Sequence, residues 1–113
     1  MAVVEKNDEK IEEKLKEFKY LIRPTHYMNY DAESKKWELE IHLPGINKEN
    51  VEFKLLNDKY FLKATRDQAI YSINENFPFE IKIDSVKGEY KDGLLKVSGD
   101  ILDPLESAFE IKL

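Results

Sequence analysis

The sequence contains no cysteine, and only four glycines, four prolines and two histidines stand among its 113 residues. Without cysteine, a disulfide scaffold, thiolate metal sites and cysteine nucleophiles are excluded, and the composition fits a reducing compartment. Apolar runs are too short to span a bilayer, and the first residues lack the apolar stretch of a signal peptide. We therefore expect a cytoplasmic protein that does not insert into membranes.

Basic clusters are also absent. The net charge is −5, with acidic and basic residues interspersed, whereas a nucleic-acid surface needs a stripe of lysine and arginine. We therefore expect no nucleic-acid partner. Charged residues make up 36% of the chain, which is typical of a heavily solvated surface. A chain of 113 residues forms one domain and can bury a core without disulfides or metals.

Residue patterns of catalysis are missing as well. His26 and His42 stand far apart and match no metal-ligand spacing such as H-E-x-x-H. The serines lack the context of a nucleophile elbow, and no glycine-rich phosphate loop is present. His42 falls on the polar face of an alternating segment, beside Glu38 and Glu40. We expect no enzyme, no metal site and no cofactor, so the function should reside in surfaces and edges that bind other proteins.

One amphipathic helix is predicted over residues 5–22. Its apolar face recurs with a helical period and consists of Ile11, Leu15, Phe18 and Ile22. Asn7 or Asp8 can cap its start, and Arg23-Pro24 ends it because proline disfavours helix at the preceding residue. Two alternatives stand for this face: it packs on its own domain, or it contacts another subunit or a client protein.

Residues 26–102 alternate between apolar and polar side chains, which predicts β-strands. The apolar positions of three such strands are Trp37, Leu39, Ile41 and Leu43; Val51, Phe53 and Leu55; and Tyr60, Leu62 and Ala64. A further strand is expected to alternate Phe79, Ile81 and Ile83. Asp92-Gly93 is a strong hairpin signal. Many short strands with turns at this spacing predict an all-β, antiparallel, immunoglobulin-like β-sandwich.

The last segment, 103–113, differs from the rest. Phe109, Ile111 and Leu113 alternate with Glu110 and Lys112, which predicts a strand-like tail. Two alternatives stand here also. The tail pairs within its own sheet, or it leaves the domain and docks on a neighbour.

Two turn motifs and the tail carry a resemblance to a known family. Leu43-Pro44-Gly45 ends an alternating strand and is followed by Lys48-Glu49. Later the chain has Gly88-Glu89-Tyr90-Lys91-Asp92-Gly93-Leu94-Leu95, and it ends in Ile111-Lys112-Leu113. In their order and spacing, over residues 25–113, these segments resemble the α-crystallin domain of the small heat-shock protein family (Hsp20).

Two features depart from that pattern. Only Asp67 to Ile70 separate Arg66 from Tyr71, too few residues for the extra strand that many family members exchange to form a dimer. Ile73 stands where the family often has arginine. The short connection is similar to the related CS/p23 domain, a co-chaperone module with the same sandwich.

The resemblance implies an ATP-independent chaperone that binds partly unfolded proteins and limits aggregation during stress, working as a dimer or small oligomer. The alternative is a CS/p23-like co-chaperone or adaptor that docks one folded partner. The resemblance also implies that Phe109, Ile111 and Leu113 insert into a groove of a neighbouring subunit. The groove is expected to be lined by those residues that face outward among Val51, Phe53, Leu55, Leu94, Leu95 and Val97. The expected organisation is a helical arm (1–24), the sandwich (25–102) and the tail (103–113).

Overall fold

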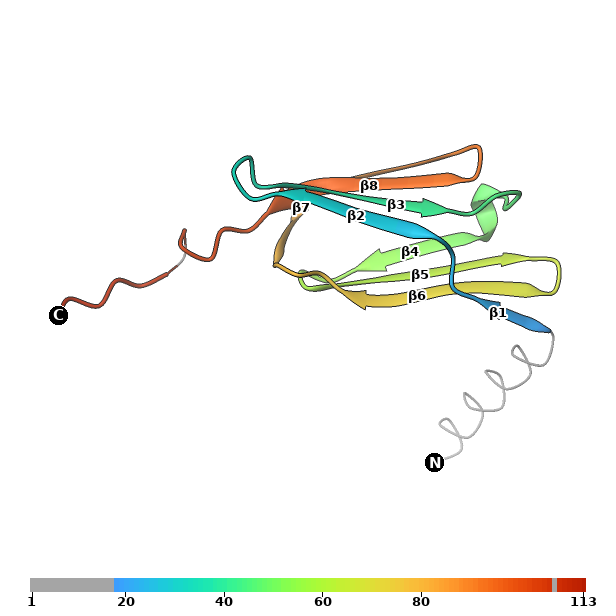
Figure 1. The fold of residues 1–113 in the computed structure, drawn as a ribbon, viewed down its shortest axis with the longest axis horizontal. Coiled ribbons are helices and arrows are strands. Elements are labelled where there is room, and N and C mark those ends of the chain that lie inside the picture. Colours follow the sequence, from blue (N-terminus) through green and yellow to red (C-terminus); the bar gives the residue numbers. More distant parts are fainter. Residues whose placement is uncertain (1–17, 107) are drawn as a thin grey trace, which may run out of the picture.

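The alternating segments form two β-sheets that pack face to face (Figure 1). The structure, a computed structural model, describes residues 18–106 and 108–113. The first sheet contains, in spatial order, β1 (Tyr20–Ile22), β6 (Ala69–Asn76), β5 (Lys59–Arg66) and β4 (Val51–Leu55). The second contains β2 (His26–Asp31), β3 (Lys36–His42), β8 (Leu94–Ile101) and β7 (Ile81–Lys91). The predicted sandwich is therefore confirmed.

Alternation places one face of each sheet in the core. The predicted inward residues of β3 and β5 are all buried. The core consists of Trp37, Leu39, Ile41, Leu43, Ile46, Tyr60, Leu62, Ala64, Ala69, Tyr71, Ile73, Phe77, Ile81, Leu95 and Val97. Polar residues take the outer positions, and His42 is exposed as expected.

Aromatic rings connect the two sheets at one end of the core. Phe77, in the connection between β6 and β7, has its ring centroid 5.0 Å from that of Trp37 on β3 and 4.9 Å from that of Tyr60 on β5. Tilted and edge-to-face geometries such as these are the favourable ones for aromatic pairs. These three aromatic residues therefore serve the core rather than an exposed stacking surface.

The prediction of a helix is wrong for its last three residues. Tyr20–Ile22 is the strand β1, which pairs in parallel with Ala69–Tyr71 of β6. The amides of Lys19 and Tyr20 also donate to the carbonyl of Gln68, at 2.8 and 3.1 Å. The open edge of β6 offers backbone partners that a helix would not use, and such tertiary pairing overrides a local periodicity. Residues 1–17, which hold most of the predicted helix, lie outside the described residues.

Near its start, β7 departs from the predicted alternation. Phe79 precedes the strand, and Ile83 is 52% exposed. The pairing with β8 shifts between Lys82↔Asp100 and Lys87↔Ser98, so five steps along β7 match only two along β8. A β-bulge of this kind reverses which side chains face inward. It turns Val86, instead of Ile83, toward the core.

Ser85 stabilises this bulge, and its replacement should be costly. Its hydroxyl donates to the carbonyl of Lys82 at 2.6 Å and accepts from the amide of Asp100 at 2.8 Å. Ser85→Ala leaves both backbone groups without this partner, so we expect the free energy of unfolding to fall by about 1–2 kcal/mol. Urea unfolding followed by tryptophan fluorescence measures the change. Ser98→Ala, at an exposed position of β8, is the matched control. Equal midpoints for the two variants would contradict the proposed role of Ser85.

Candidate interaction surfaces

The two turn motifs found in the sequence meet in space. The amide of Leu43 donates to the carbonyl of Gly93 at 2.6 Å. Asp92 and Gly93 both have positive φ angles, 50° and 78°, which is the geometry of a two-residue hairpin turn. A Cβ atom on Gly93 would lie 2.9 Å from the Cα of Pro44. Glycine is therefore required at position 93 both by its backbone conformation and by this close approach.

Tyr90 strengthens the same junction. Its hydroxyl donates to the carbonyl of Ile46 at 2.5 Å and lies 3.1 Å from that of Leu43. Burial raises the pKa of the Tyr90 hydroxyl. On the other side, a guanidinium nitrogen of Arg66 donates to the carbonyl of Pro44 at 2.8 Å. The junction therefore joins β7 of the second sheet to the connection that leads into β4 of the first.

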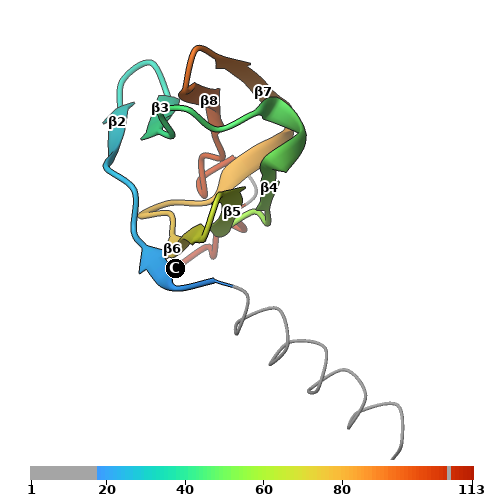
Figure 2. The same cartoon turned by 90° about the vertical axis from the view of Figure 1, so that its right-hand side faces the viewer.

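An apolar seam runs along this side of the sandwich. Figure 2 shows β4, the edge of the first sheet, beneath β7, the edge of the second. We define the β4–β7 seam as the five residues that pack partly buried against the core from these two strands: Val51, Phe53, Leu55, Val86 and Tyr90. Both strands have an outer edge without a neighbouring strand among the described residues. Such a seam can accept apolar side chains, and an open edge can accept an added strand.

The residues predicted to line a groove are divided by this arrangement. Val51, Phe53 and Leu55 line the seam, but Leu95 and Val97 are core residues, 6% and 2% exposed. Their strand, β8, lies between β3 and β7 and has no open edge. Leu94 is half-buried. The strand opposite β4 is β7, and sequence reasoning missed its Val86 and Tyr90. The bulge that turns Val86 inward follows from tertiary pairing, but Tyr90 already stood in the quoted turn motif.

The tail is the most exposed apolar segment that the structure describes. The side chains of Phe109 and Ile111 are 91% and 73% exposed, and that of Leu113 is fully exposed. Residues 108–113 form no strand and pair with neither sheet. Figure 1 shows the tail leaving the sandwich at the end opposite the turn junction. The predicted strand is therefore not formed in this single chain. The described residues of the tail also do not pair with their own sheet, which was one of the two alternatives.

The predicted helix face falls only partly on the described residues. Ile11 and Leu15 lie outside the described residues. Phe18 lies just before β1 and is half-buried, and Ile22, in β1, packs against the core. At least Ile22 therefore stabilises its own domain.

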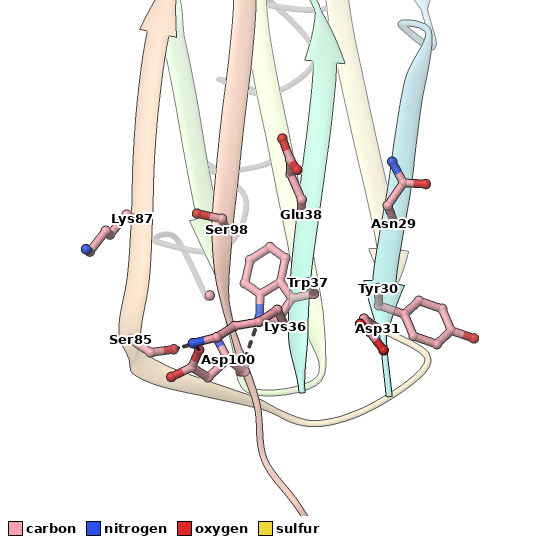
Figure 3. A pocket seen from close by; sticks show the side chains of 11 residues that line it. Asn29, Tyr30, Asp31, Lys36, Trp37, Glu38, Ser85, Lys87, Ser98 and Asp100 are labelled. Atoms are coloured by element: carbon pink, nitrogen blue, oxygen red, sulfur yellow. Dashed lines mark hydrogen bonds and ion pairs between the residues drawn. The ribbon is translucent and has the colours of Figure 1, made fainter. Parts of the chain in front are cut away.

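The outer face of the second sheet is polar. Figure 3 shows a shallow hollow there, where Asn29, Lys36, Glu38 and Ser98 project from three neighbouring strands. Lys36 forms a salt bridge with Asp100, and the hydrogen bond within this pair lowers the pKa of the Asp100 carboxyl. The indole nitrogen of Trp37 donates to the carbonyl of Asp100 at 3.2 Å. These interactions stabilise the strand ends, and they assemble no nucleophile with a base.

Within residues 18–106 and 108–113, no three histidine, cysteine, aspartate or glutamate side chains come together in a way that could hold a metal ion. His26 Nδ1 lies 2.9 Å from the carbonyl oxygen of Pro24, so this side chain forms a local hydrogen bond with the backbone. The described residues contain the short 3₁₀ helix η1 (Lys48–Asn50) and no helix that is long and apolar enough to cross a membrane.

Comparison by sequence finds no matching family model and no matching curated protein. Comparison by structure finds similar chains. Heat shock protein 16.0 from Schizosaccharomyces pombe is 16% identical and superposes with a TM-score of 0.63 over 81% of this chain and 98% of its own. A small heat-shock protein from Xylella fastidiosa is 13% identical, with a TM-score of 0.62 over 81% and 96%. A truncated form of small heat shock protein AgsA from Salmonella typhimurium is 20% identical, with a TM-score of 0.57 over 81% and 98%.

The likeness covers 81% of this chain and nearly the whole length of those chains. It agrees with the resemblance seen in the two turn motifs, which the structure brings into contact. The chain therefore has the fold of the small heat-shock proteins, an immunoglobulin-like sandwich of two four-stranded sheets.

Proposed function

We propose that this protein is an ATP-independent chaperone of the small heat-shock type, which binds partly unfolded proteins and limits their aggregation. The observation that carries the proposal is the fold shared with heat-shock proteins, together with the exposed apolar tail that this fold presents. Binding of this kind involves no chemical step, so neither an enzymatic site nor a cofactor has a role in it. A cytoplasmic location, suggested by the lack of cysteine, belongs to the same proposal.

Client binding would use apolar surface that adapts to many sequences. Unfolded proteins expose apolar side chains and unpaired backbone groups. The β4–β7 seam offers a partner for both, because apolar side chains lie beside two open strand edges. The organisation into arm, sandwich and tail is also part of the proposal, with β1 from the predicted arm contributing a strand to the sandwich.

Self-assembly is proposed to use the tail. Ile111 and Leu113 of one subunit would dock in the β4–β7 seam of another, where they would meet Val51, Phe53 and Val86. The exchange of a strand from the loop after β5 plays no part in this assembly, because Asp67 and Gln68 alone connect β5 to β6. We expect a dimer or small homo-oligomer formed through other contacts.

An aggregation assay tests the chaperone proposal. A heat-labile enzyme is warmed until it scatters light, with rising ratios of this protein and no ATP. We expect scattering to fall steadily and to be largely suppressed at an equimolar or higher ratio. An unrelated acidic protein of similar mass is the control for crowding and charge. Unchanged scattering at a several-fold excess would rule the proposal out.

The runner-up is a CS/p23-like adaptor that docks one folded partner. The short Asp67–Gln68 connection favours it, because this turn leaves no room for an exchanged strand. Affinity capture before and after heat treatment distinguishes the two functions. One stoichiometric folded partner at both temperatures supports the adaptor, whereas a heat-dependent mixture of proteins supports the chaperone.

A further inference from the structure

The tail begins at a network of charged groups that connects three parts of the chain. Asp103 is the first residue of the tail segment, and its carboxylate accepts a hydrogen bond from Lys35 Nζ at 2.6 Å. Lys35 lies in the turn between β2 and β3, 68 residues earlier. The other carboxylate oxygen of Asp103 accepts from the amide of Leu105 at 2.9 Å, which closes a local turn.

Glu106 extends this network to a third element. Its carboxylate lies 3.4 Å from Lys82 Nζ, near the start of β7, and 3.9 Å from Lys35 Nζ. Its amide also donates to the carbonyl of Asp103 at 3.0 Å. Two backbone bonds hold the residues just before the network, because the amides of Ile101 and Leu102 donate to Lys35 and Glu80, both at 2.8 Å.

Residues 108–113 make no hydrogen bond or ion pair with any other described residue. The last described hydrogen bonds and ion pairs of the chain before Ile111 and Leu113 are therefore those of the network. Hydrogen bonding to Lys35 also lowers the pKa of the Asp103 carboxyl.

We infer that Lys35, Lys82, Asp103 and Glu106 form a charge clamp that sets the exit direction of the tail and points its apolar residues away from their own sandwich. The clamp makes the tail available to a second copy of this chain. That consequence rests on the proposed function, whereas the clamp itself does not.

A solvated ion pair is weak, but a weak bias still shifts the population of directions when the described residues beyond it, 108–113, make no hydrogen bond or ion pair. Removing Lys35 should change the population of the clamped direction about two- to fivefold. Lys36 provides a matched control. It is the next residue, it also forms a salt bridge with an aspartate, Asp100, and it does not touch the tail.

The test uses the absence of cysteine, which allows two spin labels to be placed freely. Ser98→Cys on β8 and Lys112→Cys on the tail carry the labels, and excess unlabelled chain suppresses distances between labelled subunits. Electron–electron double resonance then gives the distance distribution between sandwich and tail. The same measurement is made with Ile111→Ala and Leu113→Ala added, so that docking cannot hold the tail in place.

In that undocked background we expect Lys35→Met to broaden the distribution, with the clamped distance losing population about two- to fivefold, and Lys36→Met to leave it unchanged. Asp103→Asn should act like Lys35→Met, because asparagine keeps the local turn but loses the charge. Equal distributions for Lys35→Met and Lys36→Met would overturn the clamp. If Lys35→Met broadens the distribution but Ile111→Ala with Leu113→Ala leaves oligomer size unchanged, the clamp stands and the proposed tail docking fails.

Discussion

Gly93→Ala is expected to lower the free energy of unfolding by about 2–5 kcal/mol. Gly93 has a φ angle of 78°, and an L-residue with a side chain pays about 1–2 kcal/mol there. The added methyl would also lie 2.9 Å from Pro44 Cα and 3.2 Å from the carbonyl oxygen of Leu43, so backbone must move. Overpacking against backbone adds about 1–3 kcal/mol. Thermal unfolding followed by circular dichroism measures the loss.

Gly88→Ala is the matched control, since a Cβ at position 88 meets no atom within 4 Å and the residue lies in the strand that leads to the same turn. We expect its melting temperature to stay close to that of the parent protein or to rise slightly. If Gly93→Ala and Gly88→Ala have equal melting temperatures, the close approach of Gly93 to Pro44 does not limit stability, and the prediction is wrong.

Replacing Ile111 and Leu113 together with alanine is expected to move the oligomer toward smaller species. Burying these two side chains in a partner contributes roughly 3–6 kcal/mol before the cost of ordering the tail. Losing even the net binding energy that remains after this cost should raise the dissociation constant of the oligomer at least about tenfold. Size-exclusion chromatography with light scattering over a range of concentrations measures the shift.

The control is Glu110→Ala with Lys112→Ala, which changes the same tail between the apolar positions. We expect this variant to keep the parent size. Both variants should keep the β-sheet circular dichroism signal of the parent, because Ile111 and Leu113 are largely exposed in their own subunit. Loss of folding in Ile111→Ala with Leu113→Ala would place the tail in its own core, contrary to the structure. An unchanged oligomer size would contradict the proposal that the tail docks on another subunit.

Much of the sandwich follows from local patterns. The alternation of Trp37, Leu39, Ile41 and Leu43 reports which face of one strand is apolar, and it correctly predicts four buried residues. Asp92-Gly93 predicts its hairpin because two adjacent positive φ angles favour these residue types. In these cases the physical cause lies within a few residues, so a single sequence contains it.

The interaction surfaces were less predictable, because their causes are not local. Alternation marks Leu95 and Val97 as apolar but does not say whether their strand lies at an edge, and β8 proves to be covered on both sides. The period of the segment ending at Ile22 predicts a helix, yet an open edge of β6 draws its last residues into a strand. Strand order and edge pairing depend on contacts between residues far apart in the chain.

The sequence by itself determined the all-β class, the inward faces of most strands, the two tight turns and an apolar tail. Each depends on side-chain alternation or on the backbone preferences of glycine and its neighbours. Only the tertiary structure decided that the two turns meet, that β7 rather than β8 lies opposite β4, and that Lys35 holds Asp103 across 68 residues. These features arise when distant segments pack together, because a bulge or an ion pair between two strands is defined only by their relative register.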